Sequence, residues 1–260
     1  MNAAAYITTS WDDGHPLDLR VADLLANHNL QGTFYVPMRT PKGNLTPAQV
    51  RELADAFEIG AHTLHHVFLT RTDDAEGERE IAQSKQWIEQ TTGKPCDMFC
   101  PPGGKYTRGH LLVMERAGFV GFRSVELLSL ALPRKRGGLW ELSTTLQAYP
   151  HLPMSYARNA LKRGALSNLS RFLLHGRGRE WPQLAQAMLE RVATRGGVFH
   201  LWGHSWEIER MNEWQRLENV LRLMSQYTRD VPCVTNGEVC RRMTTPVVAP
   251  TPLPRPVPGS

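Results

Sequence analysis

The sequence predicts an α/β fold built around a barrel of parallel strands, and two observations carry this prediction. Short apolar segments that end in turn residues alternate with amphipathic helical segments through most of the 260 residues. About seven such repeats fit within the chain, which favours a closed or nearly closed barrel over an open sheet. In this architecture, the catalytic groups lie at the carboxyl ends of the strands.

The expected elements follow one another regularly. Residues 5–11 are rich in β-branched and aromatic side chains and stop at the turn signal Asp12-Asp13-Gly14. Residues 17–28 carry apolar side chains at helical spacing, and Thr46-Pro47 supply the cap and first-turn proline of another helix. Further strands are expected at 32–37, 58–62, 97–100, 119–123, 197–202 and 231–235, and further helices at 47–57, 75–90, 109–117, 183–194 and 213–228.

The chain is expected to form a single domain over residues 1–242. The interval 130–180 does not follow the strand–helix rhythm and is interpreted as an insertion or a lid over the site. The last fifteen residues contain six prolines, so residues 243–260 are expected to be a Pro-rich disordered tail.

Composition excludes several classes of protein. A hydrophobic fraction of 41% with 21% charged residues is typical of a globular chain and excludes a disordered one. No apolar run approaches the ~18–20 residues of a membrane span, and no export signal is visible, so we expect a cytoplasmic protein. The four cysteines are too few and too irregularly spaced for a disulfide framework, and a zinc site at Cys96 and Cys100 is a minor alternative.

The positive charge is concentrated in one segment. The chain carries a net charge of +5, and the segment 151–179 holds six basic residues and no acidic one. Such a segment is either a solvated basic face or a surface that meets an anionic partner, such as the phosphate of a substrate. No helix-turn-helix or zinc-finger spacing accompanies it, so nucleic acid is not an expected partner. The basic residues are Arg158, Lys162, Arg163, Arg171, Arg177 and Arg179.

Two acidic residues, Asp12 and Asp13, follow the first predicted strand directly. Adjacent carboxylates repel each other unless a cation or a shared proton relieves the repulsion. One of them can therefore bind a metal ion while the other stays free to act as a base. An exposed pair of turn residues is the alternative interpretation.

A histidine cluster, His62, His65 and His66, follows the strand expected at 58–62. The i, i+4 spacing of His62 and His66 predicts that both imidazoles lie on one face of a helical turn, with His65 pointing elsewhere. Two imidazoles and one carboxylate suit zinc or another divalent transition metal. Structural histidines are the alternative.

The late strand carries a third group of candidates. On a strand, residues 200, 202 and 204 share a face, so His204 is expected at the end of the strand as a general acid for a leaving amine. His200 is expected to be a histidine of the barrel interior. The tryptophans Trp11, Trp202 and Trp206 are interpreted either as a sugar-stacking surface or as barrel core.

Together these groups resemble the motifs of the polysaccharide deacetylases, also called the NodB-homology or family 4 carbohydrate esterases. Residues 9–14 (TSWDDG) resemble the family's T-F-D-D-G motif, and residues 62–66 (HTLHH) match H-[ST]-x-x-H in full. Residues 100–104 (CPPGG) correspond to R-x-P-[FY]-G, and residues 202–204 (WGH) correspond to L-x-H. The resemblance extends over residues 5–240 with the motifs in the expected order.

The resemblance implies a distorted (β/α)7 barrel and metal-dependent deacetylation of an N-acetylated sugar. It implies that Asp13, His62 and His66 bind the metal, Zn²⁺ in the first place and Co²⁺ or Ni²⁺ as alternatives. Asp12 would be the general base that takes a proton from the attacking water, and His204 the acid that protonates the amine. The substrate and oxyanion contacts would come from Pro102, Gly103, which offers its N–H, and Trp202.

The sequence departs from the family in two places. Cys100 stands where the family has an arginine that orients the catalytic aspartate, and Arg123, at the end of the strand 119–123, is the best-placed substitute. The family's D-x-x-D-W stretch has no counterpart at residues 123–126, so the substrate pocket is expected to differ.

Without an export signal, we expect a nucleotide- or lipid-linked sugar intermediate as substrate, with the basic segment 151–179 facing its phosphate. The alternatives are a hydrolase of another linear or cyclic C–N amide, and an inactive relative that binds a glycan or phosphate.

Overall fold

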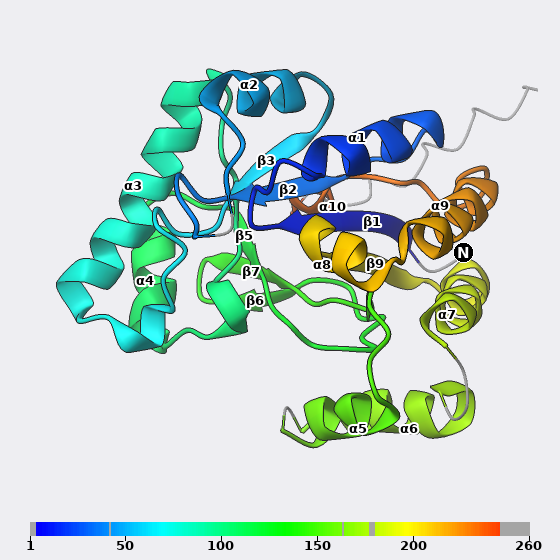
Figure 1. The fold of residues 1–260 in the computed structure, drawn as a ribbon. Coiled ribbons are helices and arrows are strands. Elements are labelled where there is room, and N and C mark those ends of the chain that lie inside the picture. Colours follow the sequence, from blue (N-terminus) through cyan, green and yellow to red (C-terminus); the bar gives the residue numbers. More distant parts are fainter. Residues whose placement is uncertain (1–3, 42, 163, 177–179, 245–260) are drawn as a thin grey trace, which may run out of the picture.

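A computed structural model describes residues 4–41, 43–162, 164–176 and 180–244. The predicted α/β fold is confirmed, because a single nine-stranded sheet curves through the molecule with helices around its outside (Figure 1). The strand order is β6-β7-β5-β4-β3-β2-β1-β9-β8, so β6 and β8 are the two edges and the barrel is distorted rather than closed. All pairings are parallel except that of β6 with β7.

The strands are short, and most were predicted from their apolar segments. Strands β1 and β9 are the longest and pair over seven residues, from Ala5 opposite Gly197 to Trp11 opposite Gly203. The bounds are β1 Ala5–Asp12, β2 Thr33–Val36, β3 Glu58–Ala61, β4 Met98–Phe99, β5 Gly121–Arg123, β6 Arg134–Arg136, β7 Leu139–Leu142, β8 Leu146–Gln147 and β9 Gly197–Gly203.

Some of the helices begin at residues whose side chains cap them. Thr46 and Gln49 form a reciprocal capping box around the first-turn Pro47 of α2, and Asp73 accepts a hydrogen bond from the Glu76 N–H at the start of α3. The bounds are α1 Asp18–Asn27, α2 Pro47–Ala56, α3 Asp74–Thr92, α4 Arg108–Arg116, α5 Pro153–Lys162, α6 Leu166–Arg171, α7 Trp181–Arg195, α8 Ser205–Met211, α9 Trp214–Tyr227 and α10 Asn236–Arg242. No helix within the described ranges is long and apolar enough to cross a bilayer.

The core fills the space between the sheet and these helices. Aromatic side chains from strands β2, β4, β5 and β9 are completely buried and belong to one hydrophobic cluster; they are Phe34, Phe99, Phe122 and Phe199. Such a core keeps the strands in fixed register. It therefore fixes the positions of the residues at their carboxyl ends.

The interval 130–180 differs from the expected insertion in its first part. Strands β6 and β7 lie there and form one edge of the sheet, and β8 forms the other edge. Each has only two to four residues, which explains why no periodic pattern predicted them. Helices α5 and α6 lie apart from the sheet, at the bottom of Figure 1. That this second part acts as a lid stays a prediction.

Two further differences concern the end of the chain. The strand expected at 231–235 is reduced to a single bridge between Ile7 and Cys233. Helices α8 and α10, each of seven residues, were not predicted because they are too short for a periodic stripe. The expected Pro-rich tail lies almost entirely outside the described residues, which end at Thr244.

Candidate active site

The predicted site residues come together at one rim of the sheet. Asp12 is the last residue of β1, His62 follows β3 directly, Arg123 ends β5 and His204 follows β9. Because the strands are parallel, all four positions lie at the same, carboxyl edge. They surround a cavity of about 230 Å³, which every predicted site residue except Pro102 lines. Pro102 is buried next to Gly103, which does line the cavity.

Three nitrogen and oxygen atoms converge as a metal site requires. Oδ1 of Asp13 lies 2.9 Å from Nε2 of His66 and 3.6 Å from Nε2 of His62. The ligand atoms of this triad all lie within 4.8 Å of one another. Burial alone would raise the pKa of Asp13, but hydrogen bonds from His62 and His66 and the charge of His204 hold it well below its usual range.

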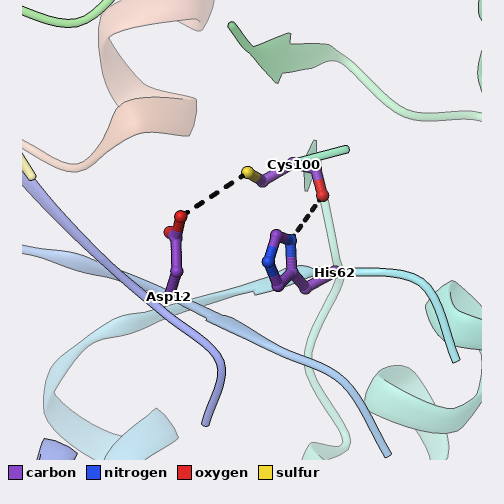
Figure 2. Close-up of side chains that lie close together, drawn as sticks. All are labelled: Asp12, His62 and Cys100. Carbon is purple, nitrogen blue, oxygen red and sulfur yellow. Dashed lines mark hydrogen bonds between the residues drawn. The ribbon is translucent and has the colours of Figure 1, made fainter. Parts of the chain in front are cut away.

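Neighbouring groups orient the atoms of this triad. Nδ1 of His62 donates to the carbonyl oxygen of Cys100 at 2.6 Å, which leaves Nε2 free to face Asp13 (Figure 2). The indole N–H of Trp206 donates to Oδ2 of Asp13 at 2.9 Å, so Oδ1 is the oxygen that faces the imidazoles.

The loop that carries the histidines is not the helical turn expected from their spacing. Thr63 and His66 have left-handed backbone conformations, with φ of 58° and 55°, and Asp13 has φ of 84°. Such conformations persist in residues other than glycine only where the surroundings enforce them, and they are enriched at functional sites. The i, i+4 histidines therefore reach one point through a strained loop.

Glu80 of α3 holds this loop in place. Its buried carboxylate accepts hydrogen bonds from the backbone N–H groups of Leu64 and His65 at 2.9 Å each, and from Nδ1 of His65 at 2.7 Å. His65 is thereby turned away from the triad, as its spacing predicted.

The donor set fits a divalent transition metal. Two imidazole nitrogens and one ionised carboxylate leave open positions for a water and a substrate oxygen. Asp12, His62 and Cys100 also lie within reach of one another (Figure 2). However, a guanidinium nitrogen of Arg123 contacts both Oδ2 of Asp12 and, at 2.9 Å, Sγ of Cys100, so this second group already holds a cation.

Arg123 lies where the sequence analysis placed the substitute for the missing motif arginine. Its completely buried guanidinium forms an ion pair with Oδ2 of Asp12. Burial would lower the pKa of Arg123, but the charge of Asp12 raises it above its usual value, so the group stays cationic. The structure thus brings together Arg123 from the end of β5 and Asp12 from the end of β1, while the role of this pair in a reaction stays a prediction.

His204 faces Asp12 from the other side of the cavity. Its Nε2 lies 4.0 Å from Oδ2 of Asp12, and its Nδ1 lies 2.6 Å from Oε2 of Glu207. A carboxylate accepts hydrogen bonds, so Nδ1 carries a proton and Nε2 is the nitrogen presented to the cavity. Gln147 donates a further hydrogen bond to the same oxygen of Glu207 at 2.8 Å.

The remaining candidates divide between cavity and core. Trp202 and Trp206 line the cavity, whereas Trp11 is completely buried in the main hydrophobic cluster. His200 is an interior histidine, as predicted: it contacts the Ser10 hydroxyl at 2.9 Å, and burial with the charge of Arg123 lowers its pKa to about 3. It is therefore neutral.

The cavity wall requires glycine at position 103. Gly103 has φ of 62°, and a Cβ atom there would lie 2.7 Å from the ring of Phe68. Any other residue would therefore be strained and would displace the aromatic ring from the cavity wall.

Two functional residues were not predicted from the sequence, Glu80 and Glu207, and Trp206 was predicted only as a stacking or core residue and not as a hydrogen-bond partner of Asp13. Glu80 belongs to a polar helix in which nothing distinguishes a buried carboxylate from an exposed one. Glu207 lies three residues after His204, a helical spacing at which side chains meet, so that signal was present.

Comparison with known proteins gives the same motifs a family context. Residues 2–122 match the family model of the polysaccharide deacetylases. The chain is 28% identical over 121 residues to the peptidoglycan-N-acetylglucosamine deacetylase of Bacillus cereus. This match covers 45% of the chain and 55% of the relative, so it spans only about half of that protein's length.

Solved structures share the fold over nearly the whole chain. A structure assigned to the polysaccharide deacetylases, from Mycobacterium smegmatis, has a TM-score of 0.67 and 18% identity and covers 99% of both chains. A family 4 acetyl xylan esterase from Clostridium thermocellum, in complex with a cobalt ion, has a TM-score of 0.56 and 18% identity over 93% of both chains. The predicted distorted (β/α)7 barrel is therefore confirmed as the fold.

Proposed function

Because the chain belongs to the polysaccharide deacetylase family, we propose that it is a metal-dependent hydrolase that removes the acetyl group from an N-acetylated sugar. One observation carries the proposal: a single cavity brings together the donor atoms of Asp13, His62 and His66, with Asp12 and His204 beside them. The name of the Bacillus cereus relative, a sugar N-deacetylase, supports the reaction, and the cobalt ion of the Clostridium thermocellum structure supports a metal.

Asp13, His62 and His66 are the residues that would hold the ion. A divalent metal there would polarise the acetyl carbonyl and lower the pKa of a neighbouring water. Zn²⁺ is the first expectation for this donor set, with Co²⁺ and Ni²⁺ as alternatives.

Asp12 and His204 divide the proton transfers. Asp12 accepts a proton from the attacking water, while Arg123 fixes the position of its carboxylate. His204, held by Glu207 with Nε2 toward the cavity, donates a proton to the nitrogen of the departing amine. The N–H of Gly103 is assigned to the developing oxyanion, and the ring of Trp202 to one face of the sugar. The products are acetate and a free amino sugar.

Removing the two imidazoles is expected to abolish metal binding. The double variant His62→Ala, His66→Ala keeps only one of the three ligands, so elemental analysis of the purified protein should find about one metal per chain in the wild type and none in the variant. His65→Ala is the matched control, because its imidazole contacts Glu80 and not the triad. Equal metal content in wild type and double variant would show that the site lies elsewhere.

Glu207→Gln is expected to lower kcat by about 10–100-fold with little change in KM, since Glu207 acts on substrate only through His204. A glutamine still fills the space but no longer stabilises the charged imidazole. The comparison requires steady-state kinetics together with thermal unfolding, and Glu209→Gln, two residues along α8, serves as the control. Unchanged kcat in Glu207→Gln would exclude a role for this carboxylate.

We also propose that the substrate is a nucleotide- or lipid-linked sugar and that the protein acts in the cytoplasm. The sequence observation behind both proposals is the basic segment 151–179, of which Arg163, Arg177 and Arg179 lie outside the described residues. Arg158 and Lys162 line a cavity of about 390 Å³ that shares Trp202 and Val125 with the metal cavity. Acetate release from such sugars would separate this function from hydrolysis of another C–N amide and from binding without turnover.

A further inference from the structure

The exposed apolar side chains of this protein are concentrated in one place. Of the nine large hydrophobic side chains that are exposed within the described residues, six lie between residues 152 and 174. Leu152 and Met154 are each 75% exposed and Leu174 is 76% exposed, values at which nearly the whole side chain meets solvent. The six residues are Leu152, Met154, Leu161, Leu166, Leu173 and Leu174, and together they define what we call the α5–α6 surface. Exposed apolar side chains gathered in one segment are typical of an interaction site.

The same surface is positively charged. Arg158 and Lys162 lie on α5 at helical spacing from Met154 and Leu161, so basic and apolar side chains share one helical face. Within the described part of the chain, neither has an ion-pair partner, and the sequence holds no acidic residue from 151 to 179.

The α5–α6 surface is held firmly on the barrel. The side chain of Asn159 accepts a hydrogen bond from the Leu127 N–H at 3.0 Å, and Asn168 donates to Glu126 at 2.9 Å. Arg171 donates to the carbonyl oxygen of Leu128 at 2.8 Å. These polar side chains face the barrel, so the apolar ones are left facing outward.

One margin of the surface reaches toward the active site. Lys162, which shares a helical face with Met154 and Leu161, lines a cavity of about 600 Å³ that shares Gly103 and Val125 with the metal cavity. A molecule bound at this margin would therefore lie near the metal cavity.

We propose that the α5–α6 surface docks on the headgroup region of an anionic lipid bilayer. Leucine and methionine side chains enter the acyl boundary, while arginine and lysine meet the lipid phosphates, which is the division of roles in interfacial helices. A second copy of the chain would bring two faces of the same charge together. Nucleic acid would satisfy the basic residues but leave the leucines in water.

Docking at a bilayer would also restrict the substrate, a step that rests on the proposed function. Docking places the opening of the cavity at the bilayer, so the acetylated sugar would be attached to a lipid rather than to a soluble nucleotide.

The experiment is sedimentation of the full chain with two kinds of vesicle. One is phosphatidylcholine alone, and the other contains phosphatidylcholine with about 30% of the anionic lipid phosphatidylglycerol. The wild type should bind the anionic vesicles and bind the neutral ones at least about tenfold more weakly. Leu161→Asp, Leu174→Asp should lower binding to anionic vesicles by at least about tenfold. Leu112→Asp on α4, which is 50% exposed and lies away from this surface, is the matched control and should bind like the wild type.

Three results would overturn the inference. The first is a wild type that does not sediment with anionic vesicles, and the second is a double variant that binds as well as the wild type does. The third is a wild-type dimer in light scattering that the double variant dissociates, which would identify a second copy as the occupant. Circular dichroism of each variant checks folding, and vesicle binding is measured without any substrate, so failure of the deacetylase assignment would not affect this result.

Discussion

Replacing Asp12 by Asn is expected to lower kcat by about 10²–10⁴-fold, the range that a positioned acid or base supplies. The amide keeps the shape of the carboxylate and can still accept a hydrogen bond from Arg123, but it cannot take a proton from water. Asp12 is not one of the three proposed metal ligands, Asp13, His62 and His66, so the metal content should stay near that of the wild type.

The control for this prediction is Asp23→Asn, an exposed aspartate on α1. Kinetics on an acetylated sugar and elemental analysis are made on the same preparations. Turnover within a few-fold of the wild type in Asp12→Asn would assign the base to another residue, and loss of metal would make Asp12 a ligand instead.

Replacing Arg123 by Met is expected to cost about 3–5 kcal/mol of unfolding free energy, because it leaves the carboxylate of Asp12 buried without its cation. Both side chains are almost completely inaccessible, at 0% and 4% exposure, so solvent cannot screen the remaining charge. Methionine preserves most of the volume and the packing on Trp202, whose ring centre lies 4.7 Å from the guanidinium carbon. The loss is therefore electrostatic.

Chemical denaturation of the single variants and of the double variant Asp12→Asn, Arg123→Met measures this effect. The double variant should be more stable than Arg123→Met, because no uncompensated charge is left in the core. In the wild type, Nε and Nη1 of Arg123 have no hydrogen-bond partner within the described residues, so the pair itself is not an ideal one. Additive losses in the double variant would mean that the two side chains stabilise the fold independently.

Much of the site could be predicted from the sequence because its residues follow strands that have a clear apolar pattern. The carboxyl ends of parallel strands meet at one edge of the sheet, so the position of a residue at such an end can be predicted once the strand is recognised. Asp12, His62 and His204 lie at this edge, as their places after predicted strands indicated. Arg123 was predicted as a neighbour of Asp12 because the family resemblance implies an arginine there and Arg123 ends a strand, and the structure joins the two side chains.

The rest depended on contacts that no local pattern encodes. Glu80 reaches the histidine loop from a helix sixteen residues away, and the left-handed conformation of His66 exists only because that loop is held from outside. The strands β6 to β8 were missed because segments of two to four residues carry too little periodicity. Their position depends on the strands that they pair with, β7 on β5 and β8 on β9, and these partners lie elsewhere in the sequence.

The central claim is removal of an acetyl group from sugar nitrogen, and measuring acetate and free amine together in one reaction tests it most directly. Metal-loaded wild type would be incubated with N-acetylglucosamine oligosaccharides and with lipid- and nucleotide-linked N-acetylglucosamine, with Asp12→Asn as the blank. We expect acetate and amine in equal amounts from the wild type and neither from the variant. Acetate without an equal amount of free amine, or no acetate from any of these substrates at full metal occupancy, would contradict the account.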